Sequence, residues 1–155
     1  MTQVKIDGFD KLKHDLSKMA DGGKQVALES IQAGGHVLEA HIKNNVRERK
    51  LWRTGNLFNS IQVYDVKSVG NYAECYVGSR GVIYARIHEF GGIIRAKRAK
   101  ALHWVDNEGN DHFAQSVQIP ARPYVRPAAD EHKEEVINFV IEKIRQEVGR
   151  YAPGS

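Results

Sequence analysis

The chain has 155 residues, of which 41% are hydrophobic and 27% charged, and its formal net charge is +4. This composition is typical of a globular protein, and no apolar run approaches the ~18–20 residues of a membrane span, which excludes an integral membrane helix. The first residues lack the apolar core of a signal peptide, and the only cysteine, Cys75, cannot form an internal disulfide. We therefore expect one domain over residues 1–155, made in a reducing cytoplasm, whose mild positive charge permits contact with DNA or an acidic partner without requiring it.

Two helices are predicted in the N-terminal third. Apolar residues recur every three or four positions over Phe9–Met19, which predicts a short helix that Asp21-Gly22-Gly23 ends. A longer amphipathic helix is predicted from about Lys24, and it ends in the basic run Arg47–Lys50. Gly34-Gly35 lies in its middle, where each glycine costs up to about 1 kcal/mol relative to alanine. We interpret that cost as a sign that another element packs closely there.

Strands are predicted in the middle of the chain. From Ser60 the apolar period changes to two, which predicts a β-hairpin over residues 60–78. Residues 82–90 are predicted to form a helical turn, ended by Gly91-Gly92. Its expected inward residues are Tyr84, Ile87 and His88. Further strands are predicted at Ile93–Arg95, Leu102–Val105 and Phe113–Ile119. The expected fold class is therefore α+β: four to six antiparallel strands packed by the long N-terminal helix and a C-terminal helix, with a β-hairpin inserted over about residues 93–117.

A proline-rich connector joins the last strand to the C-terminal helix. Three of the four prolines of the chain lie within the eleven residues Ile119–Ala129. Each proline fixes its own φ and favours extended geometry in the residue before it, so the connector is predicted to be stiff. Pro127 is predicted to lie in the first turn of a helix that runs to about Arg150. We expect Arg122 to pair with a carboxylate or to cap carbonyl groups within the fold; if it does not, it is a surface residue available for assembly.

Three blocks of sequence, in order, resemble a known family. They are Thr54–Ile61, Tyr84–Gly92 and Pro120–Ala128. Together they resemble the neck proteins of long-tailed phages, which act as tail-completion or head–tail joining proteins, and the likeness runs from about Ile6 to about Val148. Residues 93–117 depart from the shorter members, which have little between the last two blocks. That insertion resembles the related phage virion-morphogenesis proteins, which also carry an inserted hairpin.

Two basic clusters are the candidate contact sites. Residues 95–100 carry four cations in six positions, and residues 47–53 carry four more beside Trp52. Each cluster is interpreted either as a solvated surface or as a surface that meets phosphate or an acidic protein face. An exposed tryptophan among arginines also has the composition of a protein–protein hot spot. The candidate subunit or partner contacts are Trp52, Arg53, Arg95, Lys97, Arg98, Lys100, Arg122 and Arg126.

No catalytic, cofactor or metal site is predicted. The seven histidines show no recognised ligand spacing, and the sequence contains no nucleophile elbow, phosphate loop or dinucleotide fingerprint. Cys75 is expected to be a buried core thiol.

The resemblance implies a non-enzymatic structural protein of a tailed phage or prophage, which joins head and tail as a ring around the DNA channel, with a hexamer as one candidate size. It implies as partners other copies of the chain, neighbouring head-closure, tail-terminator or tail-tube proteins and, non-specifically, packaged DNA. The isolated protein is then a monomer or a ring, found in the host cytoplasm during assembly and afterwards in the neck or tail of the virion. The alternative is a nucleic-acid-binding module that uses residues 47–53 and 95–100.

Overall fold

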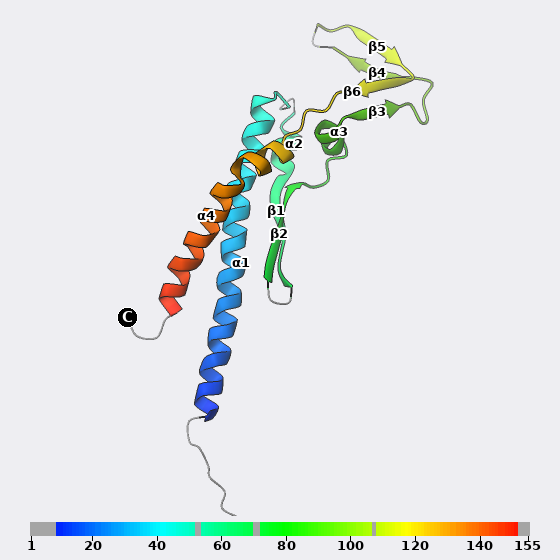
Figure 1. Cartoon of the computed structure of the whole chain (residues 1–155). Coiled ribbons are helices and arrows are strands. Elements are labelled where there is room, and N and C mark those ends of the chain that lie inside the picture. Colours follow the sequence, from blue (N-terminus) through cyan, green and yellow to red (C-terminus); the bar gives the residue numbers. More distant parts are fainter. Residues whose placement is uncertain (1–8, 52–53, 70–71, 107, 152–155) are drawn as a thin grey trace, which may run out of the picture. The chain divides into compact units, whose positions relative to one another are not determined.

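The computed structural model describes residues 9–51, 54–69, 72–106 and 108–151 (Figure 1). It divides the chain into two compact units, Met1–Ala40 with Gln62–Val77 and His132–Ser155, and His41–Ile61 with Gly78–Glu131. We refer to them as the first and the second unit. The described elements in chain order are α1 (Phe9–Glu48), α2 (Asn56–Ser60), β1 (Ile61–Val69), β2 (Tyr72–Ser79), α3 (Ala85–Phe90), β3 (Gly92–Arg95), β4 (Leu102–Val105), β5 (Asp111–Ala114), β6 (Ser116–Ile119) and α4 (Val125–Tyr151).

The predicted α+β class is confirmed, with long N-terminal and C-terminal helices and small antiparallel sheets. The described strands form three two-stranded sheets, with the orders β1-β2, β3-β6 and β4-β5. The number of strands agrees with the expected four to six, but they do not share one sheet. The described strands therefore form three separate two-stranded ladders instead of one continuous layer.

The predicted break at Asp21-Gly22-Gly23 is wrong, because α1 is a single helix of 40 residues from Phe9 to Glu48. A glycine costs a helix only about 1 kcal/mol, and helix propagation is cooperative. The turns on both sides of the glycines therefore keep the helix continuous. The Gly23 position has open space around it, so no neighbouring element forces a break there. The predicted C-terminal end of this helix, in the basic run after Val46, is confirmed.

In the first unit, α1 packs against α4 on one side and against the β1–β2 hairpin on another (Figure 1). A Cβ atom added to Gly34 would lie 2.4 Å from Cγ2 of Val140, and one added to Gly35 would lie 3.1 Å from both Sγ of Cys75 and Cγ1 of Val63. The close packing predicted for this glycine pair is confirmed: the missing side chains let α4 and the hairpin approach the backbone of α1.

In the second unit, residues Gly92–Ile119 form a four-stranded extension that we call the arm (Figure 1). At its root β3 pairs antiparallel with β6, from Gly92 opposite Ile119 to Arg95 opposite Ser116. Beyond it β4 pairs antiparallel with β5, from Leu102 opposite Ala114 to Val105 opposite Asp111. The predicted insertion over 93–117 is thus a nested pair of ladders. The predicted strand Phe113–Ile119 is divided near Gln115, and its two parts pair with different strands.

Candidate assembly surfaces

A buried carboxylate, Glu89 of α3, caps the N-terminus of α4 in the second unit. Its Oε2 accepts hydrogen bonds from the backbone amides of Tyr124 (2.7 Å) and Val125 (2.9 Å), and its Oε1 accepts one from Arg126 (3.0 Å). The next residue, Pro127, has no amide hydrogen, so one side chain satisfies the first donors of the helix. The negative charge also complements the positive end of the helix dipole. Glu89 is only 7% exposed, and we call this arrangement the Glu89 cap.

The backbone around the cap is joined to the connector at two further places. The amide of Arg122 donates a 2.7 Å hydrogen bond to the carbonyl of His88. Gly91 has a φ of 69°, and a Cβ atom there would lie 2.8 Å from the amide nitrogen of Ala121, which is too close for any other residue. The connector, the root of the arm and the first turn of α4 are therefore held together by α3.

Burial around the cap changes the ionisation of two side chains. Tyr124 is almost fully buried, and burial together with the Glu89 carboxylate raises the pKa of its phenol to about 12. Its carbonyl accepts a hydrogen bond from Nδ2 of Asn45 on α1. Burial, with a smaller contribution from the Arg122 charge, lowers the pKa of His88, so its imidazole is neutral at pH 7.

The buried residues of α3 differ from those expected. The helical turn predicted over 82–90 is confirmed, but its buried side chains are Ala85 and Glu89, and Tyr84 is 39% exposed. Glu89 was missed because a glutamate in a short helix is ordinarily solvated. One signal was available: Glu89 lies in one block of the resemblance and its amide partners lie in the next.

The arm exposes charge next to apolar surface. We call Arg95–Lys100 the basic segment; its four cations are exposed, and among the residues that the structure describes none has a carboxylate within ion-pair distance. Phe113 is 70% exposed and Ile93 56%. One side of the arm holds an open apolar groove of about 260 Å³, the arm groove, which is lined by Ile94, Leu102, His103, Trp104, Val117 and Ile119. An extension made of two two-stranded ladders is too small to bury these side chains by itself.

Two histidine–aspartate pairs hold the outer ladder of the arm. Nε2 of His103 lies 2.6 Å from Oδ1 of Asp111, and Nε2 of His112 lies 2.8 Å from Oδ2 of Asp106. The hydrogen bond from His112, supported by bonds from Asn110, lowers the pKa of Asp106. Each histidine also stacks on an aromatic ring across the ladder, His103 on Phe113 and His112 on Trp104. These pairs join opposite strands at the end of the arm, and their four side chains are 30–62% exposed.

The other apolar surface lies on α4, in the first unit. Val136, Val140, Ile144 and Val148 recur in the sequence as one apolar stripe of a helix would, but they do not lie on one covered face. Val136 and Val140 face α1 at Gly34. The same face of α4 continues with Lys143 and with Glu147, which is only 7% exposed, and Nζ of Lys143 lies 3.0 Å from Oε1 of Glu147. We call these four residues the inner stripe. The outer stripe is Ile137, Ile141, Ile144 and Val148, whose side chains are 36–53% exposed.

The predicted contact residues fall in three groups. Trp52 and Arg53 lie outside the described residues. Arg122 is exposed, and among the residues that the structure describes its side chain has no carboxylate partner; Glu89 of α3 binds backbone amides instead. The four cations of the basic segment are all exposed. Arg126 is exposed too, and its Cζ lies 5.6 Å from the ring centroid of Phe90. In the other basic cluster, Arg47 lies over the ring of Phe58 at 4.6 Å.

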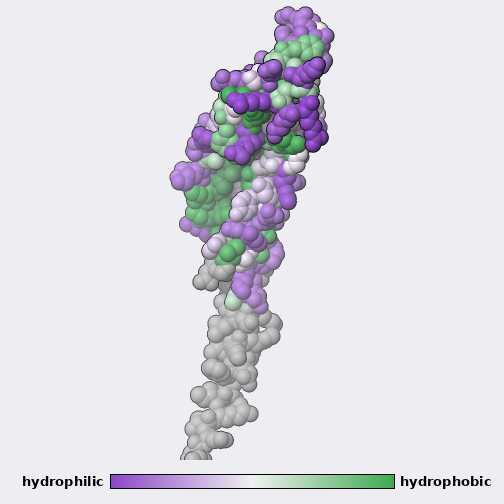
Figure 2. Space-filling view, turned by 90° about the vertical axis from the view of Figure 1, so that its right-hand side faces the viewer, coloured by the Kyte–Doolittle hydropathy of each residue, from purple (hydrophilic) through white to green (hydrophobic). Residues whose placement is uncertain are grey.

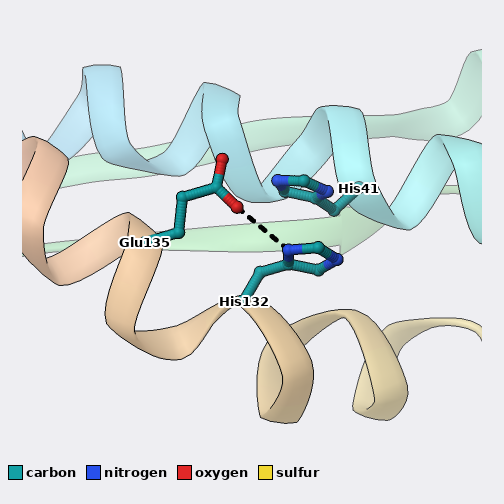
Figure 3. A group of neighbouring side chains, drawn as sticks. All are labelled: His41, His132 and Glu135. Atoms are coloured by element: carbon teal, nitrogen blue, oxygen red, sulfur yellow. Dashed lines mark hydrogen bonds and ion pairs between the residues drawn. The ribbon is translucent and has the colours of Figure 1, made fainter.

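Figure 2 shows that hydrophobic residues are open to solvent among hydrophilic ones on the face that it draws. Figure 3 shows a polar pair of α4, His132 and Glu135, together with His41 of α1. Nδ1 of His132 lies 3.0 Å from Oε2 of Glu135, one helical turn along. The pair alone offers two ligands, fewer than the three or four protein ligands of a zinc site, and we assign no metal to it.

One protein family, the phage virion morphogenesis family, matches residues 31–145 of the chain. No curated protein and no solved structure gives a significant match. The matched range contains the glycine pair of α1, the Glu89 cap, the whole arm and most of α4. Within the described residues, no helix is long and apolar enough to cross a membrane.

Proposed function

Since the chain belongs to the phage virion morphogenesis family, we propose that it is a non-enzymatic structural component of a phage neck or tail, which completes the tail and joins it to the head as a ring around the DNA channel. Membership of the family establishes a protein of virion morphogenesis. The neck position and the ring are our proposal.

One observation carries the proposal: the chain exposes apolar side chains on regular elements that its own fold does not cover. The outer stripe of α4 and the exposed residues of the arm are aliphatic or aromatic. Contiguous apolar surface of this kind on a protein normally marks an interaction site. A protein that functions by assembling requires such surfaces, whereas one that turns over a small substrate requires a concave pocket in which a few polar groups converge.

The Glu89 cap suits an assembling protein because it holds the root of the arm beside the first turn of α4. A ring with one rotation axis uses heterologous contacts, in which one surface of each subunit meets a different surface of the next. The arm and the outer stripe of α4 are two different surfaces of the kind that such contacts need. The expected partners are further copies of the chain and the neighbouring head-closure, tail-terminator or tail-tube proteins.

The proposal predicts the phenotype of a deletion. In the phage or prophage that encodes the chain, removing the gene should give filled heads and separate tails that do not join stably. Expression of the chain in trans should restore infectious particles, and the Arg98→Glu variant should restore fewer. Electron microscopy of the lysates and plaque counts measure both outcomes. Normal particles from the deletion would refute the neck position.

A second candidate function, non-specific binding to DNA, is favoured by the basic segment. Four exposed cations without described acidic partners could contact up to four phosphates, for which the slope of log K against log salt would be about −3 to −4. A filter-binding titration over a range of salt concentrations tests it. A salt-insensitive or undetectable interaction would leave the assembly function as the only candidate.

A further inference from the structure

The two stripes of α4 are arranged in a way that the isolated fold does not explain. The outer stripe is the inner stripe displaced by one residue, which is about 100° around the helix. A helix of a self-contained domain turns its aliphatic stripe to the core and its charges to water. Here Lys143 and Glu147 lie on the inner face, and Ile144 and Val148 lie on the outer one.

The spacing of the outer stripe is that of a helix that binds in a groove. Ile137, Ile141, Ile144 and Val148 are separated by four, three and four residues, so they lie on one face over three turns. Helices that dock into apolar grooves use anchors at this spacing. The arm groove is apolar and open, and five of its six lining residues are aliphatic or aromatic.

Charge beside the two surfaces is opposite in sign. Four exposed carboxylates, of Asp130, Glu131, Glu134 and Glu135, precede the outer stripe along α4. The basic segment connects β3 to β4, the strands that supply Ile94, Leu102 and Trp104 to the groove. Each surface thus combines an apolar region with a charged region, and the charges are complementary.

We propose that the outer stripe of α4 in one copy of the chain docks in the arm groove of a second copy, with the basic segment of that second copy beside the carboxylates that precede the stripe. The occupant of the groove is therefore another copy of this chain. The inference rests on the proposed ring and specifies its contact: each subunit gives α4 to one neighbour and its arm to the other, which is the heterologous arrangement that can close a ring.

The first test maps the contact by photocross-linking with full-length chains. Benzoylphenylalanine replaces Trp104 in the groove, and Ile83, which is 98% exposed outside the arm, is replaced likewise in a control variant. Mixed ¹⁵N-labelled and unlabelled chains are irradiated at high concentration and, separately, in assembled particles. The expected product from position 104 joins one isotope to the other and contains the peptide around Ile141. The control position should not give that product.

The alternatives give distinct products. If every product contains peptides of a single isotope, the arm binds α4 of its own chain. Links between two arms, or from the arm to another virion protein, would mean that the groove has a different occupant. Each of these results overturns the proposal. Absence of any Trp104 product in assembled particles overturns it as well. If the deletion still prevents joining of heads and tails, the proposed function survives while this contact fails.

The second test is a charge exchange measured by sedimentation of the purified chain. Arg98→Glu alone and Glu134→Arg alone should each weaken self-association about fivefold, and the double variant should recover most of the loss. Ile141→Asp should weaken association at least tenfold, since it places a charge in the apolar contact. Asp21→Arg, an exposed reversal on α1, is the matched control and should change nothing. Additive losses in the double variant would show that Arg98 and Glu134 do not meet, contrary to the proposal.

Discussion

At the scale of single residues, Glu89 has the clearest structural role in the chain. Its two carboxylate oxygens receive three backbone hydrogen bonds from the start of α4. Hydrogen bonds to a charged acceptor are each worth about 1.5–3 kcal/mol, and their donors would otherwise be left buried and unpaired. The same side chain links two separate blocks of the resemblance, which gives those blocks a shared physical reason.

Replacing Glu89 should therefore destabilise the chain in a graded way. Glu89→Ala should lower the free energy of unfolding by about 3 kcal/mol or more, because all three amides lose their acceptor. Glu89→Gln should cost about half as much, since its amide oxygen can still accept two bonds while its nitrogen cannot accept the third. Urea denaturation followed by circular dichroism measures both.

The matched control for Glu89 is Glu131→Ala, an exposed glutamate on α4. It should change the free energy of unfolding by less than about 0.5 kcal/mol. An equally small effect of Glu89→Ala would mean that the cap does not hold the start of α4.

At the scale of elements, the contact between α1 and α4 in the first unit depends on the absence of a side chain. One methyl group of Val140 lies 2.4 Å from the place where Gly34 would carry a Cβ atom. Close approach of two helix backbones compensates for the helix propensity that glycine loses, about 1 kcal/mol. Gly23 lies in the same helix without such a neighbour.

This difference predicts opposite effects of one substitution at two positions of α1. Gly34→Ala should destabilise the chain by about 1–3 kcal/mol, because the added methyl group forces Val140 away. Gly23→Ala should stabilise it by up to about 1 kcal/mol, through helix propensity alone. Thermal melting of the two variants beside the unmodified chain gives the comparison. Stabilisation by both would mean that α1 and α4 do not pack at Gly34.

At the scale of the whole molecule, the basic segment should distinguish the free chain from the assembled one. Residues 96–101 lie between β3 and β4 without helix or strand, and the four cations are exposed. Trypsin should cut the free chain there first, since exposed loops are preferred sites of proteolysis. Arg145 is a control within α4: its side chain is 70% exposed, but its backbone is helical.

Assembly should protect the basic segment, because a docked α4 of the neighbour would cover it. Mass spectrometry of limited digests, before and after incorporation into particles, gives the order of the cuts. Resistance of the free chain at Lys97 and Arg98 would contradict an accessible basic segment.

Much of the local structure was predictable because local rules govern it. The end of α1, the β1–β2 hairpin, the short helix α3 and the start of α4 near Pro127 follow from periodicity, glycine and proline. The helix break at Gly22-Gly23 was predicted wrongly, because a local rule includes the cost of a glycine but not the cooperativity of the helix around it. The division of the last strand of the arm near Gln115 follows from its pairing partners, which no local pattern specifies.

The sequence by itself determined the fold class, the family resemblance and the charge of the basic segment, since these depend on residue order and composition. Only the tertiary structure decided that Glu89 is a buried cap, because the burial of a carboxylate depends on which amides the fold brings to it. It also decided which side of α4 is free. In the sequence, apolar residues lie on two adjacent faces of α4, Val136 with Val140 on one and the outer stripe on the other. The packing of α1 against Val136 and Val140 covers the first of these faces. The aliphatic side chains of the outer stripe remain exposed, which is why we propose that face as the docking surface.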